Sequence, residues 1–368
     1  MSKNKSQSSI FNHHFILVCL ALVLLSSCKV DFSPNAPWRE VPNVYCVIDP
    51  QEDTVWVRVQ RCFLGEDNLY NYAPIADSNY YAPGDISVHL LAWKGRIENG
   101  VQLIPTNQLV NRWELTYTER AGKPEGSFPS GMQPLYYCVP GARQLELDTG
   151  CVFQLVVIKN ATGDTLASAT TNLVGFLDKT IRLRDTTEVI LLSPNSARAN
   201  EFGFRVGCRG VIKWNTLPRG RLYQPIVTFF YRKNGDTLSI DIPGTPLVDE
   251  RGALWLTSSS ITSTRFLSTI KNHLKDNTDS LFFVNNVDVT ILVCNEDLKA
   301  YISSHQNSVT SGQEYTTYSN IQGGVGIFGS RRGHIRVNVP CDSIGTPAPQ
   351  FIDYELLNLG VGFYGNFQ

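Results

Sequence analysis

The residue pattern most suggestive of cofactor chemistry is a glycine run at residues 324–329, which reads Gly-Val-Gly-Ile-Phe-Gly and matches GxGxxG. In a dinucleotide-binding fold this motif follows a strand, opens a helix and places a pyrophosphate at the helix N-terminus. Residues 331–334, Arg-Arg-Gly-His, would break such a helix, and residues 335–339 are typical of a strand. We therefore interpret the glycines as a tight turn that leads into a closely packed strand, and we predict no cofactor.

A second motif, residues 268–271 (Ser-Thr-Ile-Lys), matches the SxxK of serine nucleophiles in penicillin-binding enzymes. Those enzymes also need a second serine motif and a Lys-Thr-Gly strand, and the sequence has neither. It has no GxSxG or HExxH pattern, and beyond residue 27 its four histidines are each isolated: His89, His273, His305 and His334. The sequence therefore predicts no catalytic residues and no metal site.

A polar segment, residues 68–85, is the best candidate for a contact surface, because it contains four tyrosines: Tyr70, Tyr72, Tyr80 and Tyr81. A tyrosine ring offers a large contact area at little cost in side-chain entropy, and its face can stack on a sugar. The alternative is a loop that packs its tyrosines onto the protein itself.

Two carboxylates near these tyrosines, Glu66 and Asp77, leave an enzymatic alternative open. Glycosidases use a pair of carboxyl groups that flank the scissile bond, and the distance between the two groups decides the mechanism. Sequence does not give that distance, so a surface glycan hydrolase stays the alternative to a binding protein.

The elements that would position these residues follow an export signal. An apolar run at residues 15–25 is too short to cross a bilayer of about 30 Å, but it has the length of a signal-peptide core. The next residues, Leu25-Ser26-Ser27-Cys28, match the cleavage box of bacterial lipoproteins, in which the cysteine is lipidated and becomes the N-terminus. An ordinary signal peptide with an incidental cysteine is the alternative.

This signal predicts a leader at residues 1–27 and a lipidated tether at residues 28–42. Acyl chains such as palmitate on Cys28 would anchor the protein to a membrane, because several chains together bind stably. Lys29 stands where some lipoproteins carry the aspartate that retains them in the inner membrane. We therefore expect an outer-membrane protein.

The overall charge excludes one class of partner. Lys and Arg total 32 and Asp and Glu total 33, which gives a formal net charge of −1. A protein that binds nucleic acid needs an excess of basic residues to neutralise phosphates. We therefore expect no nucleic-acid partner.

The fold class that we expect is mainly β, with two β-sandwich-like domains. Short alternating segments recur between turn signals, and no repeat of fixed period is visible. The first domain, residues 43–175, would be immunoglobulin-like. The second, residues 176–340, would be β-rich with two short helices, and residues 341–368 would form a C-terminal tail.

The element boundaries come from alternation, caps and turn residues. A helix is predicted from a cap at Ser263-Thr264 to Leu274, and another from a cap at Asn295 to Ser304. Asn234-Gly235 predicts a type I′ hairpin. The predicted strands are residues 44–48, 54–62, 86–93, 113–118, 135–139, 151–159, 165–173, 180–184, 188–192, 201–208, 211–214, 226–233, 237–242 and 287–294.

Seven cysteines remain after the lipidated one, and an odd number cannot all pair within the chain. None forms a CxxC pattern, and most lie in apolar segments, which favours buried thiols. Cys138 and Cys151 are the best-placed pair if a disulfide exists. The seven are Cys46, Cys62, Cys138, Cys151, Cys208, Cys294 and Cys341.

The stretch from residue 297 to residue 329 resembles a lipoprotein family of the Bacteroidota whose function is unknown. Members of that family end their folded part with Asn-Ile-x-x-Gly-x-Gly-x-Phe-Gly, and residues 320–329 match this signature. The leader and the early strands also fit. The resemblance implies an architectural role for the signature, in which Asn320 hydrogen-bonds nearby backbone and Gly324, Gly326 and Gly329 permit close approach.

The resemblance also implies a β-rich protein of the outer membrane, often encoded near TonB-dependent transporters, with no established activity and no catalytic residues to carry over. We therefore expect a non-enzymatic binding or accessory component of such a transport system. Its partners would be the membrane, the transporter, and a glycan or peptide ligand. A glycan hydrolase and a purely structural or adhesive envelope protein are the alternatives.

A recurrent Asp-Thr or Asp-Ser pattern resembles the O-glycosylation acceptor that the Bacteroidota use on exported proteins. The alternative is turn chemistry, because Gly-Asp-Thr suits a turn that leads into a strand. The six candidate acceptors are Thr54, Thr165, Thr186, Thr237, Ser280 and Ser343.

Replacing the lipidated cysteine tests the anchor. In cells fed labelled palmitate, we expect Cys28→Ser to remove the label from the protein and to release it from the membrane fraction, because the acyl chains hold it there. The control is Cys19→Ser, which changes a cysteine inside the leader and should keep the label. A labelled Cys28→Ser protein would contradict the assignment.

Overall fold

The structure is a computed structural model, and the chain divides into residues 1–39 and residues 40–368. We describe residues 40–62, 69–98, 102–123, 125–126, 128–141, 145, 150–175, 191–192, 209–250, 256–311, 318–340 and 351–364. The leader, Cys28, Glu66, Thr186, Ser343 and the predicted strands at 180–184 and 201–208 lie outside these residues. None of the described helices is long and apolar enough to span a membrane.

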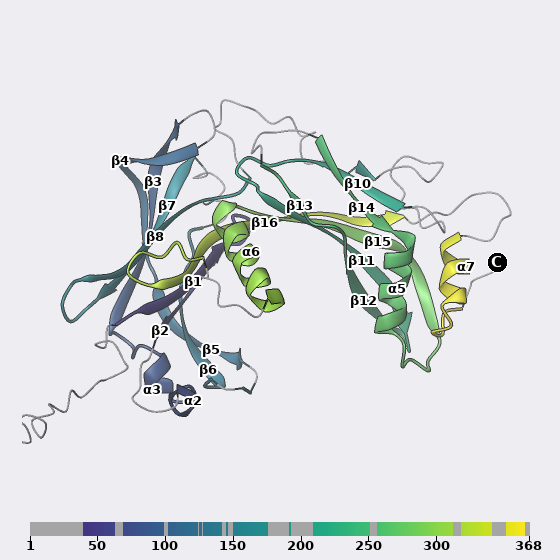
Figure 1. Ribbon diagram of the computed structural model, residues 1–368, viewed down its shortest axis with the longest axis horizontal. Helices are drawn as coiled ribbons and strands as arrows, with labels where there is room; N and C mark the ends of the chain where they lie inside the picture. Colours follow the sequence, from purple (N-terminus) through teal and green to yellow (C-terminus); the bar gives the residue numbers. More distant parts are fainter. Residues whose placement is uncertain are drawn as a thin grey trace, which may run out of the picture. The chain divides into compact units, whose positions relative to one another are not determined.

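The described part is mainly β, as expected, and its largest sheet has nine strands (Figure 1). The strand order is β12-β11-β15-β16-β1-β2-β6-β5, with β13 beside β11. These strands are β1 (Pro42–Ile48), β2 (Val55–Arg61), β5 (Thr116–Lys123), β6 (Gly131–Cys138), β11 (Leu222–Lys233), β12 (Asp236–Pro243), β13 (Leu247–Val248), β15 (Leu281–Cys294) and β16 (Val325–Pro340).

Two smaller sheets complete the described strands, with orders β4-β3-β7-β8 and β14-β10-β9. The first contains β3 (Ile86–Glu98), β4 (Gln102–Glu114), β7 (Cys151–Lys159) and β8 (Thr165–Asn172); the second contains β9 (Leu191–Leu192), β10 (Arg209–Asn215) and β14 (Leu256–Thr262). The described helices are α2 (Leu69–Tyr72), α3 (Ala76–Asn79), α5 (Ser263–His273), α6 (Glu296–Ser311) and α7 (Phe351–Asn358).

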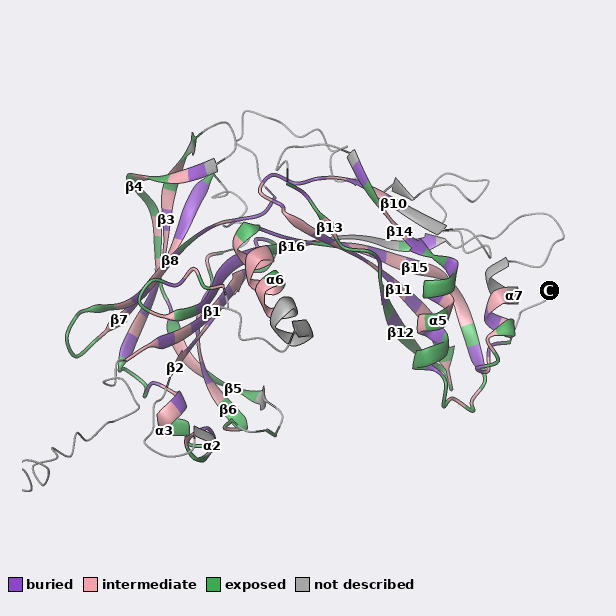
Figure 2. Ribbon diagram, viewed as in Figure 1, coloured by how far each residue is buried: buried purple, intermediate pink, exposed green. Residues whose placement is uncertain are grey.

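Alternation of apolar and polar residues decides which face of each strand is buried. In β1 the side chains of Val44, Cys46 and Ile48 are buried, while the residues between them are half-buried. Strand β11 alternates in the same way from Tyr223 to Tyr231 (Figure 2). Side chains in a strand point to opposite faces with a period of two, so each strand buries one face and leaves the other for a covering element or solvent.

The described residues form two hydrophobic cores. The chain passes from one core to the other just before the predicted domain boundary at residue 175. Leu173 belongs to the core shared by β1, β2 and β6 with β3, β7 and β8. Val174 belongs to the core of β10, β11, β15, α5 and α7. The nine-stranded sheet nevertheless belongs to both cores. Its strand β16 contributes Phe328 to the first core and Val339 to the second.

Strands β1 and β16 join the two halves of the large sheet as parallel neighbours. Tyr45 pairs with Ile327 and Val47 with Gly329, so most of the glycine motif forms the start of β16 itself and is not a turn before a strand. Gly326 adopts φ +119°, and a Cβ at this position would lie 2.0 Å from the Val44 carbonyl oxygen. Glycine is required here by both backbone conformation and space.

A side-chain amide holds the start of β16. Asn320 Oδ1 accepts a hydrogen bond from Phe328 N at 2.9 Å, and Asn320 Nδ2 donates to Phe328 O at 2.7 Å. The amide therefore pairs with Phe328 as a neighbouring strand would. Close by, Ser168 and Gln322 exchange backbone hydrogen bonds, which ties β8 to the segment before β16.

The start of α6 is fixed by Asn295, the predicted cap. Asn295 Oδ1 accepts from Leu298 N at 3.2 Å, while its Nδ2 donates to Thr171 Oγ1 at 2.7 Å. Asp297 accepts from Thr171 Oγ1 at 2.9 Å and from Tyr318 Oη at 2.8 Å. Burial raises the pKa of Asp297, although these hydrogen bonds act in the opposite direction.

Several local predictions are confirmed and three need correction. The first correction is that α6 ends at Ser311 and not at Ser304. Asn234 and Gly235 have φ values of +52° and +94°, as the hairpin of β11 and β12 requires. The cap of α5 is Thr262, one residue before the predicted pair, and its side chain accepts from Arg265 N. The predicted strand at 113–118 is two strands in different sheets, because the chain crosses between sheets at the buried Leu115.

The structure shows the state of the described cysteines. Cys138 is a free, buried thiol, so the Cys138–Cys151 disulfide does not form. Cys46 and Cys294 are free and buried as well, and burial raises the pKa values of Cys138 and Cys294 to about 12. The buried-thiol interpretation is correct for these residues, whereas Cys62 is only half-buried. Cys208 and Cys341 lie outside the described part.

Substitution of Gly326 tests the joint between β1 and β16. We expect Gly326→Ala to lower the free energy of unfolding by at least ~3 kcal/mol, because it adds a steric clash to an unfavourable φ. The matched control is Gly163→Ala, where φ is +75° and a Cβ would meet no atom within 4 Å. Gly163→Ala should lower the free energy of unfolding by about 1 kcal/mol. Urea denaturation measures both variants. An equal decrease in the free energy of unfolding for Gly326→Ala and Gly163→Ala would contradict the steric argument.

Candidate functional site

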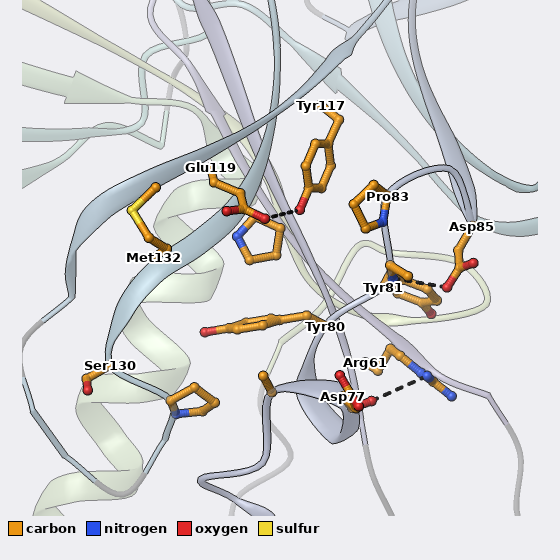
Figure 3. Close-up of a pocket in the computed structure, with 14 residues that line it drawn as sticks. Arg61, Asp77, Tyr80, Tyr81, Pro83, Asp85, Tyr117, Glu119, Ser130 and Met132 are labelled. Carbon is orange, nitrogen blue, oxygen red and sulfur yellow. Dashed lines mark hydrogen bonds between the residues drawn. The ribbon is translucent and has the colours of Figure 1, made fainter.

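A cavity of about 420 Å³ lies between the segment that carries α3 and strands β5 and β6 (Figure 3). Tyr80 extends its ring across the middle of the cavity, and Tyr117 and Met132 lie on the opposite strands. The Met132 side chain is 53% exposed although it is large and apolar. Ligand sites in proteins have this size and this mixture of aromatic surface and a few polar groups.

The segment that carries Tyr80 is held by its own side chains. Asn79 is buried, and its Nδ2 donates to Ala73 O at 2.9 Å and to Ile75 O at 2.7 Å. Asp85 Oδ2 accepts from Ala82 N at 3.0 Å and so closes the turn before β3. Tyr80 also forms a bridge with Gln60 next to β2. These contacts give the tyrosines defined positions.

Tyr80 and Tyr81 have different environments although they are neighbours. Tyr81 is 4% exposed and belongs to the first core. Tyr80 is half-buried, and its hydroxyl is enclosed without a hydrogen-bond partner among the described residues. Burial raises the pKa of Tyr80. The Tyr81 hydroxyl is enclosed in the same way, so the two tyrosines differ in how far their rings are buried.

Three carboxylates and one guanidinium surround the cavity: Asp77, Asp85, Glu119 and Arg61. Glu119 Oε1 accepts from Tyr117 Oη at 2.7 Å, and burial together with this bond raises the pKa of Tyr117 to about 12. Arg61 Nη1 donates to the Asp77 backbone carbonyl at 3.5 Å, and its guanidinium lies over the Tyr81 ring. Within the described residues, the carboxylate of Asp77 has no ion-pair partner.

A second cavity of about 460 Å³ adjoins the first, because both are lined by Arg61, Tyr81 and Asp85. Its far wall contains an ion pair between Lys159 and Glu40. We refer to these two adjoining cavities together as the groove.

The structure separates the four tyrosines that the sequence singled out. Tyr80 and Tyr81 line the cavity, whereas Tyr72 on α2 is half-buried elsewhere and the side chain of Tyr70 lies outside the described part. Sequence reasoning missed Tyr117, Glu119 and Met132, which come from distant strands. The turn residues Pro129 and Ser130 before β6 were the available signal, because they mark the loop that borders the site.

The other motifs do not assemble a site in the described part. Ser268 is exposed on α5, and its hydroxyl donates to Arg265 O at 3.0 Å. The described residues contain no group of three or more His, Cys, Asp or Glu side chains that could hold a metal ion. Among the candidate acceptors, Thr165, Thr237 and Ser280 are exposed and Thr54 is half-buried, each at or just before the start of a strand.

Comparisons with known proteins do not place the chain. No family model matches it, and no curated protein matches it. The function must therefore be argued from the residues of the groove.

Substitution of the two neighbouring tyrosines tests their different roles. We expect Tyr81→Ala to lower the free energy of unfolding by about 3–5 kcal/mol, because it removes a core ring. Tyr80→Ala should cost less than about 1.5 kcal/mol, because its ring is half-buried and its hydroxyl has no partner to lose among the described residues. Urea denaturation measures both. A larger loss for Tyr80→Ala would assign Tyr80 to the core and not to the cavity.

Proposed function

We propose that this protein is a lipid-anchored binding protein of the outer membrane that captures a ligand in the groove at Tyr80. The observation that carries the proposal is an open cavity that is lined by aromatic and charged side chains. The Tyr80 ring crosses the cavity, and the exposed Asp77 carboxylate beside it forms no ion pair within the described residues. Groups that are positioned without being used by the fold are available to a ligand.

We also propose the cellular setting that follows from Cys28 and from the signature at residues 320–329. The lipid on Cys28 anchors the protein to the outer membrane, and a TonB-dependent transporter is its partner. The two facing sheets of the first core form the immunoglobulin-like β-sandwich, and the groove lies at one end of it. One or more of the exposed Asp-Thr and Asp-Ser sites carries an O-glycan.

A surface glycan hydrolase is the second candidate function. The observation in its favour is that Asp77, Asp85 and Glu119 line the same cavity. Retaining and inverting glycosidases both use two carboxyl groups across the sugar. Hydrolysis, and not binding alone, would be supported if the wild-type protein releases reducing sugar from a glycan and Asp77→Asn does not.

Purification of the tagged protein from its own membranes in mild detergent tests the proposal. We expect a stoichiometric β-barrel transporter to co-purify, as mass spectrometry would show. The comparison is with Cys28→Ser, which lacks the lipid and should recover less of the transporter because it does not concentrate at the membrane. Recovery of the wild-type protein alone would overturn the accessory role and would favour the structural alternative.

A further inference from the structure

The groove consists of two adjoining cavities, each of which could take one unit of a longer ligand. Its two cavities, of about 420 and 460 Å³, share Arg61, Tyr81 and Asp85. Single ligand pockets in proteins span about 300–1,000 Å³, so each cavity alone can hold a small ring. A chain molecule would place successive units in the two cavities and pass over Arg61.

The groove carries an excess of negative charge. Lys159 is neutralised by Glu40, with which it forms an ion pair. The remaining charged groups are the carboxylates of Asp77, Asp85 and Glu119, and the guanidinium of Arg61. Among the described residues Arg61 forms no ion pair; it contacts the Asp77 carbonyl and the Tyr81 ring instead. Three negative charges therefore face the positive charge of Arg61, and Arg58 adds a second positive charge near Tyr80.

This charge pattern selects the ligand class. A partly enclosed negative groove raises the local concentration of cations and repels anions. The face of an aromatic ring also attracts a cation, since the ring quadrupole is negative there. Tyr80 offers such a face, which can also stack on the C–H surface of a sugar ring. A ligand that fits all three features has flat rings, several units and amino groups.

We propose that the groove binds an oligosaccharide with free amino groups, with one amino sugar at Tyr80 and the next units beyond Arg61. This inference rests on the proposed binding function. The ammonium groups lie among Asp77, Asp85 and Glu119, and Tyr80 supports the first ring. The excess of negative charge disfavours oligosaccharides with carboxylate or sulfate groups.

Calorimetry with the mature lipidated chain in detergent tests the proposal, using two tetramers that share one skeleton. The probe is the β-1,4-linked tetramer of glucosamine, and its fully N-acetylated form is the uncharged control. At about pH 6 the free amines are protonated. We expect the amine tetramer to bind at least tenfold more tightly than the acetylated tetramer, and at least tenfold more tightly than the glucosamine dimer.

The double variant Asp77→Asn/Glu119→Gln should remove the preference, so that both tetramers bind with equal affinity. The matched control is Glu52→Gln/Asp53→Asn, which changes the net charge equally in an exposed turn outside the groove and should keep the preference.

The outcomes separate this inference from the proposed function. Equal affinity of the wild-type chain for both tetramers, or a preference that survives in Asp77→Asn/Glu119→Gln, would overturn the selection of amino groups. Equal affinity for dimer and tetramer would overturn the extended groove. If neither tetramer binds, the amino-sugar assignment fails, while co-purification of the transporter still decides the proposed function separately.

Discussion

The parallel pairing of β1 with β16 is the contact on which the rest of the structure depends. The paired residues, such as Val44 and Gly326, lie far apart in the sequence, so a long loop must close before the pairing forms. The hydrogen bonds of Asn320 and the positive φ of Gly326 prepare the start of β16 for this contact. Once formed, it turns two groups of strands into one sheet with two cores.

The groove depends on this joint through the strands that follow β1. Strand β2 is held between β1 and β6 and ends at Arg61, and β6 holds β5, which carries Tyr117 and Glu119. The wall formed by residues 76–85 leads into β3, whose sheet packs on the same core. Loss of register in β1 would therefore move Arg61 relative to Tyr80, because a shift of one residue turns every side chain to the opposite face.

Caps, turns and alternation in the sequence predicted many of the helices and strands. Most features that they did not predict depend on pairing between strands that lie far apart in the sequence. Asn295 and Asn234-Gly235 were readable because a cap and a type I′ turn need particular residue types. Strand β4 was missed because Pro105 and its polar neighbours do not alternate, and its register with β3 is irregular. The sequence identified only part of the cavity lining. Tyr80 and Tyr81 lie in one polar segment, but Glu119 comes close to them only through the pairing of β5 with β6.

Two polar clusters in this chain differ in how completely the fold pairs their polar groups. Around Asn295 and Asp297 the buried polar atoms are hydrogen-bonded to one another, to Thr171 and to Tyr318. A satisfied cluster of this kind fixes how α6, β8 and β16 meet and leaves little for a partner to gain. At the groove the carboxylate of Asp77 has no ion-pair partner among the described residues. The proposed ligand would pair with Asp77 without breaking an ion pair, and it would share Glu119 and Asp85 with the hydrogen bonds that they accept from Tyr117 and Ala82.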